Sequence, residues 1–300
     1  MSDATATQRT DRTLGFIGVG VMGEPMCRHL AVKSGATVLA VDRAWEPLRR
    51  LAEHGVVEAT IAQVARQASI IFLSLPSGEV MREVVLGEEG LLLRLEKGTV
   101  IVDLSTSSVE VTREVATRLG EKGIRFADAP VMRTRAAAEA GTLAVPVGAP
   151  DDLFARLEPL IGMFASDVIH AGGTGAGQTV KILNNMVLYE TVLALSEAAA
   201  IGRRAGVDAQ VLFEAFSVGS ADSFALRNHG MKAIAPQVFP ERAFPVSYAK
   251  KDIGYAMALA ESVGVDACGA RTLLGVFDRA IEAGHASKYA PAISLVLEGK

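Results

Sequence analysis

Three glycines near the N-terminus, Gly18, Gly20 and Gly23, constrain the fold of this chain more than any other feature. They lie between a short apolar segment, Leu14–Gly18, which is typical of a buried strand, and Met22–Lys33, which has the pattern of a helix. The first glycine permits a tight turn, the second lets a pyrophosphate approach the backbone, and the third lets helix and strand pack closely. The pattern therefore predicts a strand–turn–helix unit that binds phosphate groups on the free N–H groups at the helix start.

Asp42 follows this unit by about 20 residues, at the end of a second predicted strand, Thr37–Val41. A carboxylate at that position can accept hydrogen bonds from ribose hydroxyls, and it would repel a 2′-phosphate. We therefore expect NAD as the cofactor, while Arg43 beside it keeps NADP open. Val21 and Met22 complete the predicted dinucleotide-binding loop. The alternative is that the glycines serve an ordinary tight turn.

The first half of the chain alternates predicted strands and helices. Further strands are expected at Ile70–Leu73, Val100–Val102, Arg125–Ala127, Leu143–Val147 and Val168–His170. Helices are expected from around Trp45–Pro47 and over Ser77–Val85 and Ser108–Leu119. Ser107 and Glu110 have the spacing of a capping box for the last of these helices. Repeated strand–helix units predict an α/β fold with a Rossmann-type, doubly wound, mostly parallel sheet.

The pattern becomes helical after the Gly172–Gly177 turn. Gln178–Arg204 predicts one long helix, Gly206 a stop, and Asp208 the cap of the next helix. We expect a disordered tail at residues 1–13 and a Rossmann dinucleotide-binding domain at residues 14–174. An all-helical domain for substrate binding and oligomerisation is expected at residues 175–300, beginning with the long interdomain helix.

Two short segments, Leu75–Pro76 and Ser105–Thr106, each follow a predicted strand. The carboxyl ends of parallel strands meet at one edge of the sheet, where ligands bind in folds of this kind. We therefore expect both segments to border a ligand. The simpler alternatives are that the proline ends a strand and that the hydroxyl groups cap a helix.

Lys181, Asn184 and Asn185 stand at positions i, i+3 and i+4 of the predicted long helix and share one face. An ammonium group can donate a proton to a carbonyl oxygen, and two amides can orient that oxygen. The spacing is consistent with a catalytic acid/base and its helpers. The alternative is a solvated lysine beside surface asparagines.

Composition excludes several other classes. The formal net charge of −4 gives no electrostatic basis for binding nucleic acid, and no apolar run is long enough to span a membrane. Met1–Arg12 lacks the features of a secretory signal. Cys27 and Cys268 lie far apart without metal-ligand spacing. We expect a reduced, cytoplasmic protein that binds no metal.

The motifs together resemble the β-hydroxyacid dehydrogenases, the family related to 3-hydroxyisobutyrate dehydrogenase. The matching segments, in family order, are Phe16–Gly23, Asp103–Thr106, Asp128–Val131, Gly141–Leu143, Lys181–Asn185 and Phe244 through Asp252. The resemblance implies NAD(P)-dependent interconversion of a small anionic 3-hydroxy acid and its semialdehyde. It implies that Lys181 is the acid/base and that Asn184 and Asn185 hold the substrate. It further implies that Ser105 contacts the substrate, that Thr106 and Lys251 lie along the cofactor, and that the protein is a homodimer or homotetramer.

One loop departs from the family pattern. Met132, Arg133 and Thr134 stand where many members have Ser-Gly-Gly, and a guanidinium suits a carboxylate, sulfonate or phosphate. This Arg-Thr pair is similar to the pair at the corresponding position of sulfolactaldehyde reductase, another member of the family. The resemblance therefore adds a sulfonate analogue to the expected substrates. The alternative is that Arg133 faces solvent or pairs with Glu139. An imine reductase, a 6-phosphogluconate-type oxidative decarboxylase and a non-catalytic NAD-binding protein are the rival functions.

Overall fold

The computed structural model describes residues 13–241 and 243–300. The chain forms two compact units, Met1–Lys181 and Ile182–Lys300, which divide within helix α8 (Ala176–Arg204). The expected tail lies outside the described residues except for Thr13, which is the first residue of strand β1 and not part of a tail.

In the described part of the chain, the first unit is built on one eight-stranded sheet. Its strands are β1 (Thr13–Ile17), β2 (Thr37–Val41), β3 (Val57–Glu58), β4 (Ile70–Leu73), β5 (Val100–Asp103), β6 (Arg125–Asp128), β7 (Leu143–Gly148) and β8 (Ala165–Gly172). The strand order is β3-β2-β1-β4-β5-β6-β7-β8, and every pair is parallel except β6 with β7. Because the chain starts in the middle of the sheet and winds outward both ways, the predicted doubly wound fold is confirmed.

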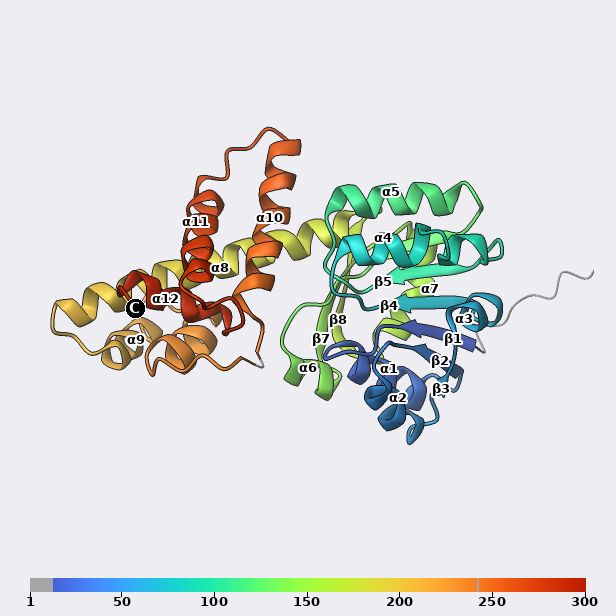
Figure 1. Cartoon of the computed structure of the whole chain (residues 1–300), viewed down its shortest axis with the longest axis horizontal. Coiled ribbons are helices and arrows are strands. Elements are labelled where there is room, and N and C mark those ends of the chain that lie inside the picture. The colour runs from blue at the N-terminus through green and yellow to red at the C-terminus, as the bar shows by residue number, and fades with distance from the viewer. Residues whose placement is uncertain (1–12, 242) are drawn as a thin grey trace, which may run out of the picture. The chain divides into compact units, whose positions relative to one another are not determined.

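Helices cover both faces of this sheet (Figure 1). They are α1 (Gly23–Lys33), α2 (Trp45–Ala52), α3 (Ile61–Gln67), α4 (Gly78–Leu86), η1 (Leu91–Leu93), α5 (Val109–Gly120), α6 (Arg135–Ala140) and α7 (Asp151–Ile161). Side chains alternate along the strands, so that Phe16 and Phe72 pack in one core with α1, α2 and α7. Ile71 and Ile101 pack in the other core with α3, α4 and α5. Strands buried on both faces are apolar throughout, which is why sequence reasoning found them.

The predicted capping box of α5 is wrong. The cap is Ser108, whose hydroxyl accepts from Val111 N at 3.2 Å. Ser107 is fully buried, and its hydroxyl donates instead to Asp103 Oδ2 at 2.9 Å. The Ser107 hydroxyl therefore donates to the buried carboxylate of Asp103 rather than capping α5 as the local spacing predicts.

Strand β8 is longer than the predicted Val168–His170, and β3, α3, α6 and α7 were not predicted. β8 lies at the sheet edge, and Ser166 and Asp167 within it are exposed. An edge strand with polar side chains lacks the apolar run that marks a buried strand, so the local pattern identified only part of it.

The second unit is helical, as predicted. Beside the rest of α8 it contains α9 (Ala209–Ser217), η2 (Leu226–Ile234), α10 (Val246–Ser262), α11 (Cys268–Glu282), η3 (Ala290–Ala292) and α12 (Ile293–Leu297). Phe213, Ile253 and Phe277 are fully buried in its core. Asp208 caps α9 through hydrogen bonds from Gln210 N and Val211 N, so this predicted helix start is confirmed.

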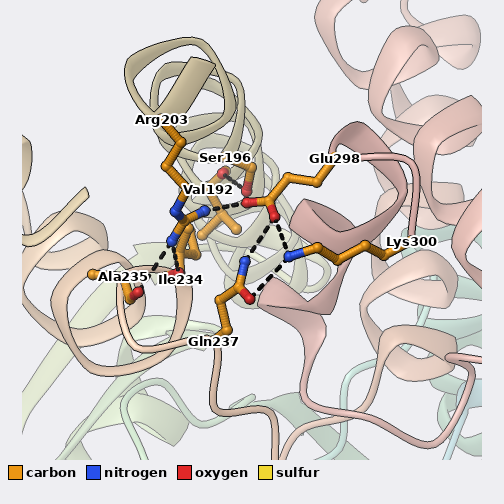
Figure 2. Close-up of polar contacts among 8 residues, drawn as sticks. All are labelled: Val192, Ser196, Arg203, Ile234, Ala235, Gln237, Glu298 and Lys300. Atoms are coloured by element: carbon orange, nitrogen blue, oxygen red, sulfur yellow. Dashed lines mark hydrogen bonds and ion pairs between the residues drawn. The ribbon is translucent and has the colours of Figure 1, made fainter. Parts of the chain in front are cut away.

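A polar cluster joins the end of α8 to the C-terminus of the chain (Figure 2). Arg203 pairs with Glu298 and donates to the carbonyl oxygens of Ile234 and Ala235 at 2.8 and 3.0 Å, at the end of η2. Lys300 Nζ lies 2.7 Å from Glu298 Oε2. Burial would raise the pKa of Glu298, but Lys300 and Arg203 hold it below its ordinary value. The cluster therefore holds three segments of the helical unit together by charge-assisted hydrogen bonds.

Candidate functional site: a dinucleotide loop and a lysine helix

Gly18, Gly20 and Gly23 are glycines for different structural reasons. Gly18 has φ +91°, and a Cβ there would collide with Ser74 O. A Cβ on Gly23 would collide with Gly18 O. By contrast, a Cβ on Gly20 would have no atom within 4 Å. The chain itself therefore needs the first and third glycines, whereas the second keeps open a space beside the backbone that a ligand can approach.

The start of α1 provides donors for that ligand. Met22 precedes the helix, and no side chain caps its first N–H groups. Val21 is 62% exposed at the same turn. Uncapped N–H groups and the positive end of the helix dipole favour an anion, so the loop fits a pyrophosphate.

Asp42 contacts the glycine loop through one carboxylate oxygen and its own following segment through the other. Oδ2 accepts from Val19 N at 2.7 Å, and Oδ1 accepts from Ala44 N at 2.8 Å. Each oxygen keeps a further lone pair, so the half-buried carboxylate can also accept from ribose hydroxyls. Arg43 is exposed next to it. These residues fit a dinucleotide, and Asp42 also has a structural role that sequence reasoning did not assign.

The two predicted ligand-bordering segments lie at the ends of adjacent strands β4 and β5. Leu75 N donates to Ser105 Oγ at 2.9 Å, which links the two segments directly. Ser105 is buried, Thr106 is half-buried, and Pro76 is exposed. The structure therefore brings Leu75, Pro76, Ser105 and Thr106 together, with the Ser105 hydroxyl also holding the neighbouring loop.

Two buried carboxylates lie beneath this edge. Asp103 ends β5 and Asp128 ends β6, and the two are paired in register and fully buried. Burial raises the pKa of Asp103 to about 6, although hydrogen bonds from Ser105 and Ser107 oppose the rise. Burial likewise raises the pKa of Asp128 to about 6 against hydrogen bonds from Gly175 and Gln178. Sequence reasoning gave these aspartates no role of their own; the signal that could have found them is an acidic residue ending each of two apolar strands.

The Met132–Thr134 loop is held by contacts to β7 and β8. Arg133 has φ +80°, a left-handed conformation that favours glycine. Its guanidinium donates to Thr142 O, Ser166 Oγ and Asp167 Oδ2 at 2.6 to 2.7 Å. The Ser166 hydroxyl and Arg133 lower the pKa of Asp167. Arg133 therefore has an acidic partner in this structure.

That partner differs from the predicted alternative. Glu139 pairs with Arg28 at 2.6 Å and with Arg135 at 3.7 Å, not with Arg133. Met132 N donates to Ala144 O at 2.8 Å, which holds the loop against β7. Thr134 precedes α6 without capping it through its side chain. Within the Met132–Thr134 loop, the exposed Arg133 and Thr134 offer the polar side chains.

Lys181, Asn184 and Asn185 lie on α8, at the spacing that places them on one face. Lys181 is half-buried, Asn184 is exposed and Asn185 is buried. Asn184 Nδ2 donates to Asn185 Oδ1 at 3.2 Å. The helix therefore presents an amine one turn before a fixed pair of amides.

Asn185 is held by a residue of the second unit that sequence reasoning did not assign to the site. Its Nδ2 donates to Asp252 Oδ2 at 2.7 Å, and both side chains are buried. Lys251 Nζ lies 3.4 Å from Asp252 Oδ1 and 5.3 to 5.7 Å from the ring centroids of Tyr255 and Tyr248. Asp252 therefore connects the amide of Asn185 with the ammonium of Lys251.

Residues 13–241 and 243–300 contain no cluster of three His, Cys, Asp or Glu side chains arranged to hold a metal ion. Within the same residues, no helix has the length and apolar character needed to cross a membrane. Cys27 is buried and burial raises the pKa of its thiol, whereas Cys268 is exposed.

Comparisons with known proteins cover nearly the whole chain. Residues 13–173 match the NAD binding domain of 6-phosphogluconate dehydrogenase, and residues 175–295 match the family described as NAD-binding of NADP-dependent 3-hydroxyisobutyrate dehydrogenase. The 2-(hydroxymethyl)glutarate dehydrogenase of Eubacterium barkeri is 36% identical over 245 residues, 81% of each chain. The 3-hydroxyisobutyrate dehydrogenase of Pseudomonas aeruginosa is 34% identical over 91% of this chain and 92% of its own. A solved Mycobacterium tuberculosis 3-hydroxyisobutyrate dehydrogenase with L-serine superposes with a TM-score of 0.86 at 29% identity, covering 96% of this chain and 99% of that one.

Proposed function

The chain belongs to the β-hydroxyacid dehydrogenases, the family of 3-hydroxyisobutyrate dehydrogenase, and we propose that it interconverts a small anionic 3-hydroxy acid and its semialdehyde. It is an NAD(P)-dependent oxidoreductase acting on a CH–OH group. The observation that carries the proposal is the arrangement on α8, where Lys181 precedes an asparagine whose amide is oriented by a buried aspartate.

The geometry of the glycine loop supports the proposed dinucleotide-binding residues. The N–H groups at the start of α1 bind the pyrophosphate beside Gly20, where no side chain intervenes. Asp42 accepts from the ribose hydroxyls, which favours NAD, while exposed Arg43 can accommodate the 2′-phosphate of NADP. Leu75, Pro76 and Thr106 border the cofactor, together with Lys251. When bound, the cofactor accepts or supplies a hydride at its nicotinamide ring.

The proton is assigned to Lys181. In oxidation the neutral amine takes the hydroxyl proton of the substrate as the carbonyl forms, and in reduction the ammonium returns a proton to the carbonyl oxygen. Asn184 and Asn185 orient that oxygen. Because Asp252 holds Asn185 in one rotamer, the amide need not be ordered when substrate binds, which lowers the entropic barrier.

The substrate's anionic group is assigned to Arg133, with Ser105, Met132 and Thr134 around it. A guanidinium recognises a carboxylate or a sulfonate through paired hydrogen bonds. In the structure these donors face Ser166 and Asp167. The substrate anion must therefore compete with a partly exposed ion pair, which costs little because exposed pairs contribute only about 0–1 kcal/mol.

A substrate panel tests the proposal. Reduction of NAD and NADP is measured with hydroxyisobutyrate, serine, glycerate, threonate and sulfolactate. Turnover with at least one of these hydroxy acids is expected, and its identity decides between carboxylate and sulfonate. Carbon dioxide release during turnover would instead indicate an oxidative decarboxylase, and turnover of cyclic imines alone would indicate an imine reductase. Tight NADH binding without any turnover would indicate a non-catalytic NAD-binding protein.

We further propose that the protein forms a homodimer or homotetramer through its helical unit, because the family resemblance implies such an assembly. Sedimentation of the full chain at several concentrations measures this. A monomer at all concentrations would contradict the assignment.

A further inference from the structure

We propose that Gln178 is a positioning residue that holds the helix carrying Lys181 at a set distance from the Ser105–Thr106 segment. The inference rests on the proposed function, because it concerns how the predicted acid/base reaches its working position. Gln178 is fully buried and lies one turn before Lys181 on α8.

The side-chain amide of Gln178 forms hydrogen bonds to the loop after β5 through both its nitrogen and its oxygen. Nε2 donates to Ser105 O at 2.8 Å, and Oε1 accepts from Ser107 N at 3.0 Å. Nε2 also lies 3.4 Å from Asp103 Oδ2, which accepts from the Ser107 hydroxyl as well. The amide therefore pairs with the loop as a neighbouring strand would, and the two segments cannot separate without leaving buried polar groups unsatisfied.

The backbone of the same residue is held from the adjacent strand. Asp128 Oδ2 accepts from Gln178 N at 2.8 Å, and Oδ1 accepts from Gly175 N at 2.7 Å. This carboxylate satisfies N–H groups at the start of α8 that have no partner within the helix. The first turn of α8 is thus held to β6 by its backbone and to the loop after β5 by one side chain.

Close packing prevents the helix start from sliding. A Cβ on Gly177 would lie 2.6 Å from Asp128 O and 2.7 Å from Pro146 O. Since Gln178 and Lys181 are three residues apart, a displacement of the first turn displaces Lys181 by a similar amount. A misplacement of about 1 Å at a reacting group can cost about 100-fold in rate, so the network has a direct kinetic consequence.

Two substitutions at this position separate positioning from folding. Gln178→Met keeps the length and packing of the side chain but removes both hydrogen bonds. Gln178→Glu introduces a carboxyl group that can accept from Ser107 N in either protonation state but can donate to Ser105 O only when it is protonated. The charged groups near this position are Asp103, Asp128, Arg113 of α5, which packs against Gly175 at the start of α8, and, one turn later, Lys181. Thr179→Val is the matched control, because Thr179 lies in the same turn and its hydroxyl donates only to Gly175 O.

The experiment combines kinetics with hydrogen exchange on the full chain. For Gln178→Met we expect kcat to fall at least about 10-fold, with the NADH Kd within about twofold of wild type. Amide exchange should accelerate in both segments, residues 103–109 and 173–181. For Gln178→Glu, kcat relative to wild type should rise as the pH falls, because protonation restores the donor. Thr179→Val should leave kcat and exchange over residues 103–109 unchanged.

Two results would overturn the inference. Faster exchange in Gln178→Met with an unchanged kcat would mean that Gln178 holds the segments together without positioning Lys181. A kcat ratio for Gln178→Glu that does not change with pH would mean that the amide donor is irrelevant, and it decides the question even where Gln178→Met folds poorly. A failure of the proposed function can be told apart from a failure of this inference. Normal turnover of Lys181→Ala would reject the assignment of Lys181 as the acid/base, but it would not alter the hydrogen-exchange result for Gln178→Met.

Discussion

The side-chain amide of Asn185 donates to Asp252 at 2.7 Å, although the two residues are 67 positions apart in the chain. Asp252 is buried, and its second oxygen lies 3.4 Å from Lys251 Nζ. One carboxylate therefore orients an amide and balances an ammonium at once. This contact gives the asparagine of the lysine helix a defined orientation, which spacing alone does not provide.

Asp252→Asn should lower kcat/KM by about 10- to 100-fold, because a buried acceptor becomes a partial donor facing the Asn185 amide, and leaving such a group unsatisfied costs about 1–3 kcal/mol. Asp278→Asn is the matched control, since Asp278 pairs with Lys250 at an exposed position. Steady-state kinetics of both variants check this. Equal, small effects of the two substitutions would show that the buried contact has no kinetic importance.

The glycine loop predicts opposite results for substitutions of the same size. Gly20→Ala should leave the melting temperature unchanged, because its Cβ enters open space, but weaken NADH binding at least about 10-fold by obstructing the pyrophosphate. Gly23→Ala should lower the melting temperature, since its Cβ would collide with Gly18 O. Thermal unfolding and NADH fluorescence titration measure both quantities. Tight NADH binding by Gly20→Ala would place the cofactor elsewhere.

Asp42→Asn should shift cofactor preference towards NADP. The substitution removes the negative charge that repels a 2′-phosphate, and it places an amide donor against the N–H of Val19 or Ala44. We expect kcat/KM for NAD to fall about 10-fold and the NADP/NAD ratio of kcat/KM to rise. The two cofactors are compared at one ionic strength. A ratio that does not change would exclude Asp42 from ribose recognition.

Arg133 and Asp167 should have opposite effects on the affinity for the anionic substrate. Arg133→Gly removes the guanidinium while relieving a left-handed backbone, so the protein should stay folded and KM should rise at least about 10-fold. Asp167→Asn removes the competing carboxylate, so KM should fall by a few fold. Measurement of KM for the best substrate of the panel decides this. Unchanged KM values in both variants would show that Arg133 has only a structural role.

The buried aspartates predict a pH dependence of stability. Both pKa values are raised to about 6, so the folded state binds more protons than the unfolded state between about pH 4 and pH 6. The contribution of these groups to the free energy of unfolding therefore falls as the pH rises through this range. In urea unfolding at several pH values, Asp103→Asn should lose stability relative to wild type, but by less at pH 6 than at pH 4. A difference independent of pH would mean that Asp103 titrates normally in the folded protein.

Much of the fold could be predicted because its determinants are local. Strands such as Ile70–Leu73 are apolar on both faces, and the glycine loop joins strand and helix within a few residues. The candidate residues Gly20, Asp42, Ser105 and Lys181 could be proposed from the same local patterns together with the family resemblance.

The contacts that hold the site could not be predicted, because they join distant parts of the chain. Gln178 reaches Asp103 across 75 positions, and Gly175 reaches Asp128 across 47. Arg133 has its partner in the edge strand β8, at Asp167, whereas a local pattern favours the nearer Glu139. No periodicity or motif encodes such pairs; only the folded topology places them together.

Lys181→Ala is the decisive variant for the assignment of proton transfer to Lys181, with Lys122→Ala as a control lysine of the same compact unit. Turnover is measured at saturating cofactor with the best hydroxy acid of the panel, and NADH binding is titrated in parallel. If Lys181 transfers the proton, kcat should fall by about 100- to 10,000-fold in Lys181→Ala, because the proton acceptor is lost, while NADH affinity and melting temperature stay close to wild type. Lys122→Ala should be fully active. Near-normal turnover of Lys181→Ala would show that another group transfers the proton.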